Sequence, residues 1–178
     1  GLPPAPTLSM RANTRIGILG LGNLLLSDEG FGVHFINYLT DRYEIPDHVA
    51  VLDGGTAGIM MAPFIEDADI LFVIDTVALR DQPPGSIHRF TDQDIQAGNI
   101  HARMSPHQVG LLDILDLCRI RETAPQETEM LTVVPEDLSV AIGLTPNLEA
   151  RLPEVMAMLE ESLARHGTVL RARAIHDA

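Results

Sequence analysis

The stretch Arg15-Ile-Gly-Ile-Leu-Gly20 decides the fold of this chain, because it is a short β-branched run closed by a glycine. A glycine-rich loop follows it, and apolar residues then recur at helical spacing at Phe31, Phe35, Tyr38 and Leu39. This pattern predicts a strand, a loop and a helix in that order. Repetition of such a unit is typical of α/β proteins with a parallel sheet.

The same alternation continues along the chain. His48 to Leu52 is a second candidate strand, which ends at Asp53-Gly54-Gly55-Thr56. The later sequence predicts a helix over Ala57–Ile65, a strand over Ile70–Ile74, an edge strand over Ser86–Phe90, a loop over Thr91–Met104, a helix from Ser105 to about Arg119, a strand over Met130–Val134 and a C-terminal helix over Leu152–Leu163 that ends at Gly167. We therefore expect an α/β fold with a mostly parallel sheet.

Composition limits what kind of protein this is. The 178 residues are 46% hydrophobic, which is enough for one compact domain with a sizeable core. Twelve basic residues stand against 25 acidic ones, and the net charge of −13 repels nucleic acid and anionic lipid surfaces. A macromolecular partner is therefore predicted to be a protein, with neither nucleic acid nor a membrane as a partner.

The N-terminal stretch and the single cysteine bear on location. Residues Gly1 to Thr14 contain three prolines and lack both a basic start and an apolar core, so they predict a flexible tail rather than a signal peptide. Residues 15–178 are predicted to form the single domain. No apolar run approaches the roughly 20 residues of a membrane helix. Cys118 is the only cysteine, which excludes an internal disulfide and favours a reducing compartment, so we predict a cytoplasmic protein.

Three potential metal ligands lie where the carboxyl ends of parallel strands would meet. Glu29 lies in the loop after the first strand, Asp75 ends the strand that begins at Ile70, and His107 is the second residue of the helix that Ser105 caps. Ligands of open parallel sheets bind beyond this edge. Two carboxylates and an imidazole suit a borderline divalent ion, and the helix N-terminus is expected to keep His107 neutral. The alternative for each residue is an ordinary capping or solvated role.

The loop that begins Gly20-Leu-Gly also fits the start of a dinucleotide-binding fingerprint, with Asp53 at the end of the next strand. We reject that interpretation because Leu25 occupies the third glycine position. In addition, the acidic pair Asp28 and Glu29 would place negative charge where a pyrophosphate binds.

Other residues have weaker links to function. Asn23, Asp28 and Asp53 are weak candidates for substrate binding, and the ordering of a loop or turn is the alternative for each. Cys118 continues an apolar helix face and is expected to be a buried structural thiol. The chain contains neither a Gly-x-Ser-x-Gly elbow nor a His-Glu-x-x-His helix, so serine hydrolases and ordinary zinc proteases are not indicated.

A family resemblance rests on five ordered motifs. The stretch Gly20-Leu-Gly-Asn-Leu-Leu-Leu-Ser-Asp-Glu-Gly-Phe-Gly32 resembles the amino-terminal signature of the maturation endopeptidases of nickel-iron hydrogenases. Four further stretches agree with that family in the same order: Asp53-Gly-Gly-Thr56, Ile74-Asp75-Thr76, Ser105-Pro-His-Gln108 and Gly143-Leu-Thr-Pro146. Each motif is short, but the ordered set spans nearly everything from Arg15 to Arg165.

The resemblance implies a single-domain three-layer sandwich, in which a mostly parallel twisted sheet carries helices on both faces. It also implies an endopeptidase that removes the C-terminal extension of a hydrogenase large-subunit precursor after nickel insertion. Nickel would be carried by the substrate, with no organic cofactor. Glu29, Asp75 and His107 match the family's metal-binding set and are the predicted catalytic residues. The alternatives are a self-sufficient metallopeptidase that holds zinc, and a non-catalytic checkpoint protein that binds the nickel-loaded precursor without cutting it.

Overall fold

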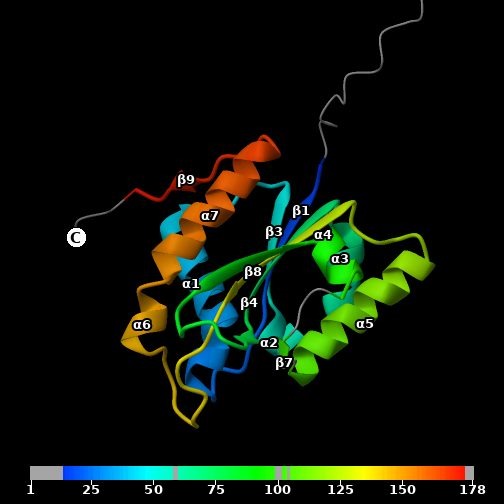
Figure 1. The fold of residues 1–178 in the computed structure, drawn as a ribbon. Helices are drawn as coiled ribbons and strands as arrows, with labels where there is room; N and C mark the ends of the chain where they lie inside the picture. Colours follow the sequence, from blue (N-terminus) through cyan, green and yellow to red (C-terminus); the bar gives the residue numbers. More distant parts are fainter. Residues whose placement is uncertain (1–13, 58–59, 99–101, 104, 175–178) are drawn as a thin grey trace, which may run out of the picture.

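The computed structural model describes residues 14–57, 60–98, 102–103 and 105–174 (Figure 1). Its centre is a five-stranded sheet with the strand order β3–β1–β4–β8–β6. Within this sheet β6 runs antiparallel to β8, and the other neighbouring strands are parallel. The five strands are β1 (Ile16–Gly20), β3 (Val49–Asp53), β4 (Ile70–Thr76), β6 (Ile87–Thr91) and β8 (Glu127–Val133).

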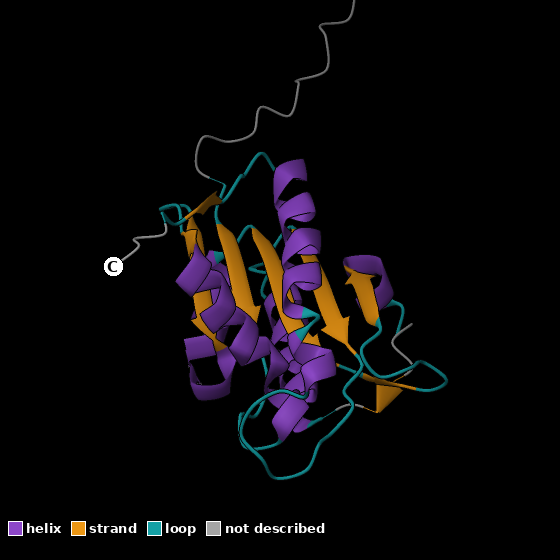
Figure 2. Ribbon diagram, turned by 90° about the vertical axis from the view of Figure 1, so that its left-hand side faces the viewer, coloured by secondary structure: helices purple, strands orange, loops and turns teal. Residues whose placement is uncertain are grey.

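Helices cover both faces of this sheet, which confirms the predicted three-layer sandwich. On one face lie α1 (Phe31–Arg42), α6 (Pro146–Glu149) and α7 (Leu152–Arg165). Figure 2, viewed from that side, shows helices in front of the strands. On the other face lie α3 (Met61–Asp67), α4 (Asp92–Gln96) and α5 (Pro106–Ile120).

Alternating strand residues divide the hydrophobic core into two parts. Ile18 and Phe72 pack toward α1 and α7, whereas their neighbours Leu19 and Val73 pack toward α3 and α5. All four are fully buried. Burying a side chain of this size stabilises the fold by about 1.5–3 kcal/mol, so both layers contribute to holding the strand ends in place.

The remaining elements are short. A 3₁₀ helix, η1 (Ser27–Gly30), precedes α1, and α2 (Gly54–Ala57) follows β3. Two antiparallel pairs lie outside the main sheet: β2 (Tyr43–Glu44) with β9 (Arg171–Ala172), and β5 (Ala78–Leu79) with β7 (Ala102–Arg103). No helix among the described residues is long and apolar enough to cross a membrane.

Two of the predicted elements differ from those in the structure, and a third prediction concerns residues that the structure largely does not describe. The predicted loop over Thr91–Met104 contains α4 and β7, because Thr91 and Asp94 form a capping box that starts a helix and Ile95 is buried beneath it. The helix predicted over Ala57–Ile65 corresponds to α3, which runs from Met61 to Asp67, and α2 lies over Gly54–Ala57, where a turn was expected. Apart from Thr14, the predicted tail lies outside the described residues.

Candidate active site at the carboxyl edge of the sheet

The candidate site lies where β1, β3 and β4 end and α5 begins. Glycines let α1 approach this edge closely. A Cβ atom at Gly32 would lie 2.2 Å from the carbonyl oxygen of Leu21 and 2.3 Å from that of Ile74. A Cβ atom at Gly20 would lie 2.2 Å from the carbonyl oxygen of Gly32. Since no side chain fits at either position, these glycines bring α1 directly against the strand ends.

Gly22 positions the turn that carries Glu29. Its φ angle is 145°, in a region that side chains of L-residues rarely adopt. A Cβ atom here would lie 2.0 Å from the carbonyl oxygen of Glu29. The backbone of η1 therefore rests on Gly22, which holds Glu29 beside the end of β1.

His107 lies between two carboxylates. Its Nδ1 atom is 3.5 Å from Oε1 of Glu29, and its Nε2 atom is 3.5 Å from Oδ1 of Asp75. The Asp75 side chain is fully buried, whereas 17% of the Glu29 side chain and 26% of the His107 side chain are exposed. The structure thus brings the three predicted ligands together, although they come from η1, β4 and α5.

Gln108 connects the start of α5 to the Asp75 carboxylate. Its buried Nε2 donates to Oδ2 of Asp75 at 2.9 Å and to the carbonyl oxygen of Thr76, and its Oε1 accepts the backbone N–H of Ser105 at 3.0 Å. The last bond belongs to the predicted capping box. The backbone N–H of Thr76 donates to Oδ1 of Asp75 at 2.7 Å. Both carboxylate oxygens are therefore held, and Oδ1 is the one near His107.

The sequence indicated the capping role of Gln108 but not its contact with Asp75. The two residues are 33 positions apart, and no local pattern relates them. The only available signal was their placement at the same edge of a predicted parallel sheet.

The neighbouring carboxylates raise the pKa of His107 above its ordinary value. The hydrogen bond to Asp75 is the largest cause, partial burial opposes it, and the charges of Asp75 and Glu29 add to it. The carboxylates thus act on the His107 pKa in the direction opposite to the helix N-terminus, which favours the neutral ring. Only the neutral ring can bind a metal ion, so metal binding and protonation of His107 compete.

The donor set suits a divalent metal ion, but the side chains are arranged as an ion-pair network. Two carboxylates and one imidazole are acceptable ligands for borderline ions. In the part of the chain that the structure describes, no group of three His, Cys, Asp or Glu side chains is placed to hold an ion. Glu29 and Asp75 face different nitrogens of the same ring. His107 would have to turn one nitrogen toward a point that both carboxylates reach.

A pocket of about 500 Å³ opens beside His107. It is lined by Asn23, Leu25 and Asp53, and by the glycines of the turns after β1 and β3, which are Gly22, Gly54 and Gly55. Oδ1 of Asn23 accepts the backbone N–H of Leu25 at 3.0 Å, and Oδ1 of Asp53 accepts that of Gly55 at 2.9 Å. Two of the weak substrate-binding candidates thus lie at the pocket, and both also order their own turns.

Asp28, the third weak candidate, is fully buried. Its Oδ2 accepts the backbone N–H groups of Glu136 and Asp137 at 2.9 and 3.0 Å and the hydroxyl of Thr145 at 3.0 Å. Its Oδ1 accepts the backbone N–H of Thr145 at 2.8 Å. With both oxygens engaged inside the protein, Asp28 orders the loop between β8 and α6, and in this conformation it has no contact with the pocket.

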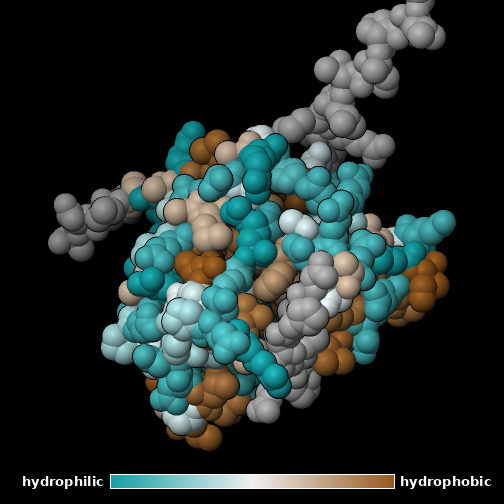
Figure 3. Space-filling model, viewed as in Figure 1, coloured by the Kyte–Doolittle hydropathy of each residue, from teal (hydrophilic) through white to brown (hydrophobic). Residues whose placement is uncertain are grey.

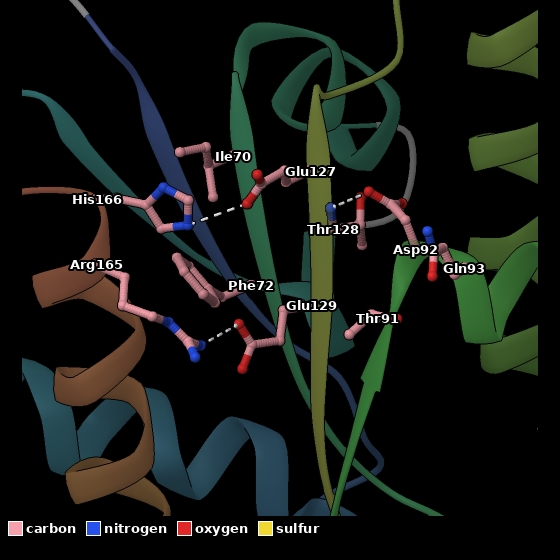
Figure 4. Close-up of a pocket in the computed structure, with 10 residues that line it drawn as sticks. All are labelled: Ile70, Phe72, Thr91, Asp92, Gln93, Glu127, Thr128, Glu129, Arg165 and His166. Atoms are coloured by element: carbon pink, nitrogen blue, oxygen red, sulfur yellow. Dashed lines mark hydrogen bonds and ion pairs between the residues drawn. The ribbon is translucent and has the colours of Figure 1, made fainter. Parts of the chain in front are cut away.

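A second cavity, of about 610 Å³, lies at the opposite edge of the sheet, between the start of β8 and the end of α7 (Figure 4). Four of its ionisable side chains form two pairs. Nε2 of His166 is 3.1 Å from Oε2 of Glu127, and Nη2 of Arg165 is 3.6 Å from Oε2 of Glu129. None of the predicted site residues lines this cavity. We therefore place the candidate site in the pocket beside His107.

Cys118 takes no part in this site. It is 1% exposed, and burial raises the pKa of its thiol. Its Sγ atom lies 3.9 Å from Oε1 of Glu66, on the helical layer that contains α3 and α5. A buried thiol with a raised pKa is a poor nucleophile. The predicted buried environment of Cys118 is confirmed.

Comparison with known proteins gives a consistent result. The family model described as hydrogenase maturation protease matches residues 33–162. The chain is 36% identical over 164 residues to the hydrogenase 2 maturation protease of Escherichia coli, covering 92% of this chain and 99% of that protein. It is 38% identical over 157 residues to the hydrogenase expression/formation protein HoxM of Azotobacter vinelandii, covering 88% and 75% of the two chains. Among solved structures, the hydrogenase maturating endopeptidase HybD from Escherichia coli superposes with a TM-score of 0.83 at 35% identity, covering 89% of this chain and 98% of that one.

Proposed function

The chain belongs to the hydrogenase maturation protease family, and on that premise we propose that it removes the C-terminal extension of a nickel-iron hydrogenase large-subunit precursor after nickel insertion. The chain is a maturation endopeptidase, and its substrate is a hydrogenase precursor. The observation that supports this proposal is the meeting of Glu29 and Asp75 at His107, which itself lines the pocket.

In this proposal the nickel arrives as part of the substrate. Glu29, Asp75 and His107 offer two carboxylates and an imidazole to an ion that already has ligands in the precursor. No dedicated metal cage is needed for such a task, which agrees with the present ion-pair arrangement of the three side chains. Recognition of the ion would place one peptide bond of the precursor at the pocket, so that geometry chooses the bond.

The two carboxylates differ in what they can do. Asp75 is fully buried, and Gln108 and Thr76 hold its two oxygens, so it suits a fixed ligand that orients His107. Glu29 is partly exposed, and its Oε1 atom lies 3.5 Å from Nδ1 of His107. We assign Glu29 the second role of taking a proton from the attacking water, because a general base has to reach that water and Glu29 is the accessible one of the two carboxylates. A nearby divalent ion polarises the scissile carbonyl or lowers the pKa of that water.

The decisive experiment uses two preparations of a matching large-subunit precursor, one nickel-loaded and one nickel-free. Each is incubated with this chain, and the products are weighed by mass spectrometry. We expect loss of a C-terminal peptide from the loaded precursor alone. Cleavage of both preparations would indicate a metallopeptidase with its own ion. Binding of the loaded precursor without a shortened product would indicate a checkpoint protein.

A substitution tests the role of Glu29 in the same assay. Glu29→Gln keeps the size of the side chain but removes its charge and its basicity, so we expect cleavage of the loaded precursor to stop while the protein stays folded. Glu161→Gln on the exposed face of α7 is the matched control and should cleave normally. Full processing by the Glu29 variant would refute the assigned role.

The compartment and the other partners follow from weaker observations. The acidic net charge of −13 supports a protein partner and disfavours nucleic acid and anionic membranes. The single buried cysteine suits a reducing environment. We therefore propose that processing takes place in the cytoplasm, and fractionation of cells that express the chain tests this.

A further inference from the structure

The loop between β8 and α6 runs alongside the glycine-rich loop of the site. The backbone N–H of Ala141 donates to the carbonyl oxygen of Leu25 at 3.1 Å, and the N–H of Ser27 donates to the carbonyl oxygen of Ala141 at 2.8 Å. The hydroxyl of Ser27 donates to the carbonyl oxygen of Gly143 at 3.1 Å. Together with the four hydrogen bonds that Asp28 accepts, these contacts hold the loop firmly beside the pocket.

Apolar side chains of these two segments point into solvent. Leu25, Leu138, Val140 and Ile142 are 60%, 49%, 85% and 85% exposed, and we call this set the apolar ledge. Val140 and Ile142 flank Ala141, whose backbone is bonded to that of Leu25, so these three side chains arise from adjoining backbone, and Leu138 lies two residues before Val140. Figure 3 shows apolar surface at the lower tip of the molecule, where the loop between β8 and α6 lies in Figure 1.

The combination of order and exposure needs a physical explanation. A surface loop that only connects two elements is expected to carry polar side chains, because contact of apolar side chains with water is unfavourable in free energy. Here the backbone is fixed by many hydrogen bonds, and large apolar side chains are displayed on it. Contiguous exposed apolar surface of this kind is typical of a protein-binding site.

We infer that the apolar ledge is the docking surface for the hydrogenase precursor and receives an apolar segment of that protein beside the bond to be cut. This inference rests on the proposed function. Leu25 identifies the occupant, because it belongs both to the ledge and to the lining of the pocket that holds His107. A polypeptide that enters the pocket from this side therefore passes over the ledge.

Charges beside the ledge define the partner further. Glu136 and Asp137 directly precede Leu138, and both are exposed. An interface with an apolar centre and a charged rim gains specificity from opposite charges on its partner. We therefore expect the docking segment of the precursor to combine apolar side chains with at least one neighbouring lysine or arginine.

The test compares two double variants in their binding to purified hydrogenase precursor from the organism that supplies this chain. Val140→Ser with Ile142→Ser removes most of the ledge. Val169→Ser with Ile120→Ser is the matched control, because these residues are 82% and 81% exposed and neither lines the pocket. Each variant loses one valine and one isoleucine from an exposed position. Thermal melting checks that both fold like the unaltered chain, and surface plasmon resonance measures the affinity.

We expect the ledge variant to bind about tenfold more weakly and the control to bind like the unaltered chain. In the cleavage assay, KM should rise for the ledge variant while kcat stays unchanged, since docking contacts act on substrate and transition state alike. Equal affinities of the two variants would overturn the inference, and so would an unaltered chain that does not bind the precursor.

Two further outcomes separate this inference from the proposed function. If the unaltered chain binds the precursor without shortening it and the ledge variant loses that binding, the ledge is supported and removal of the extension is contradicted. If the chain forms a dimer in solution that the ledge variant alone dissociates, the ledge belongs to a second copy of the chain and the inference fails.

Discussion

Replacing Gln108 by leucine removes the side chain that joins the helix start to the Asp75 carboxylate. Leucine has a similar volume, so the change leaves no large cavity and acts on hydrogen bonds. Three are lost: those from Nε2 to Asp75 and to the carbonyl oxygen of Thr76, and the one that the backbone N–H of Ser105 donates to Oε1. Oδ2 of the buried Asp75 is left without its donor.

The size of the effect follows from these contacts. A hydrogen bond to a charged group contributes about 1.5–3 kcal/mol. Loss of half of a capping box costs about 0.5–1 kcal/mol, and the carbonyl of Thr76 at the end of β4 adds a similar amount. Part of this is recovered because water can reach the side of the site where His107 is exposed. We therefore expect the Gln108→Leu variant to lose about 2–4 kcal/mol of its free energy of unfolding, a large share of the usual 5–15 kcal/mol.

Urea unfolding followed by circular dichroism measures this loss, and the precursor assay measures cleavage. Gln96→Leu, at an exposed position near the end of α4, is the matched control and should change neither. Gln108→Glu keeps the acceptor for Ser105 but replaces the donor that faces Asp75 by a second carboxylate, so it disrupts only the Asp75 side of the contact. We expect both Gln108 variants to lose cleavage, because neither can hold Asp75 in place. A stability loss below about 1 kcal/mol in Gln108→Leu, with cleavage intact, would refute the positioning role.

Because the pKa of His107 is raised, we expect NMR titration of the metal-free protein to find a pKa above the ordinary value of a histidine ring. Asp75→Asn should lower this pKa more than Glu29→Gln does, since Asp75 is the largest cause, and an unchanged pKa in Asp75→Asn would contradict the electrostatic explanation. Protonation of His107 should stabilise the metal-free fold fully below the unfolded pKa, and this contribution is lost as the pH rises through the folded pKa. Gly22→Ala should cost at least about 1–3 kcal/mol in urea unfolding and reduce cleavage, because its Cβ would collide with the backbone of Glu29. Gly110→Ala is its control, because nothing lies within 4 Å of that Cβ in α5, and it should stabilise the protein by about 0.5–1 kcal/mol.

Much of the fold follows from local sequence patterns. The β-branched run before Gly20 and the buried run from Ile70 are strands, and the capping box at Ser105 does start α5. These predictions succeed because apolar periodicity and capping are properties of neighbouring residues. The same reasoning overlooked α4, although Thr91 and Asp94 supply the same kind of cap, because a helix of five residues has too few apolar positions to show a period.

The sequence by itself determined the fold class, the order of the main strands and helices, and the three residues that converge on the carboxyl edge, because parallel strands all end on that side of a sheet. The tertiary structure alone decided how these residues interact. The His107 ring lies between two carboxylates from distant segments, which raise its pKa, whereas the helix terminus favours the neutral ring. Asp28 turned out to be a buried anchor for a loop more than 100 residues away, and that anchor is what displays the apolar ledge. Electrostatic and hydrogen-bond partners of this kind depend on distances in space, which spacing along the chain does not record.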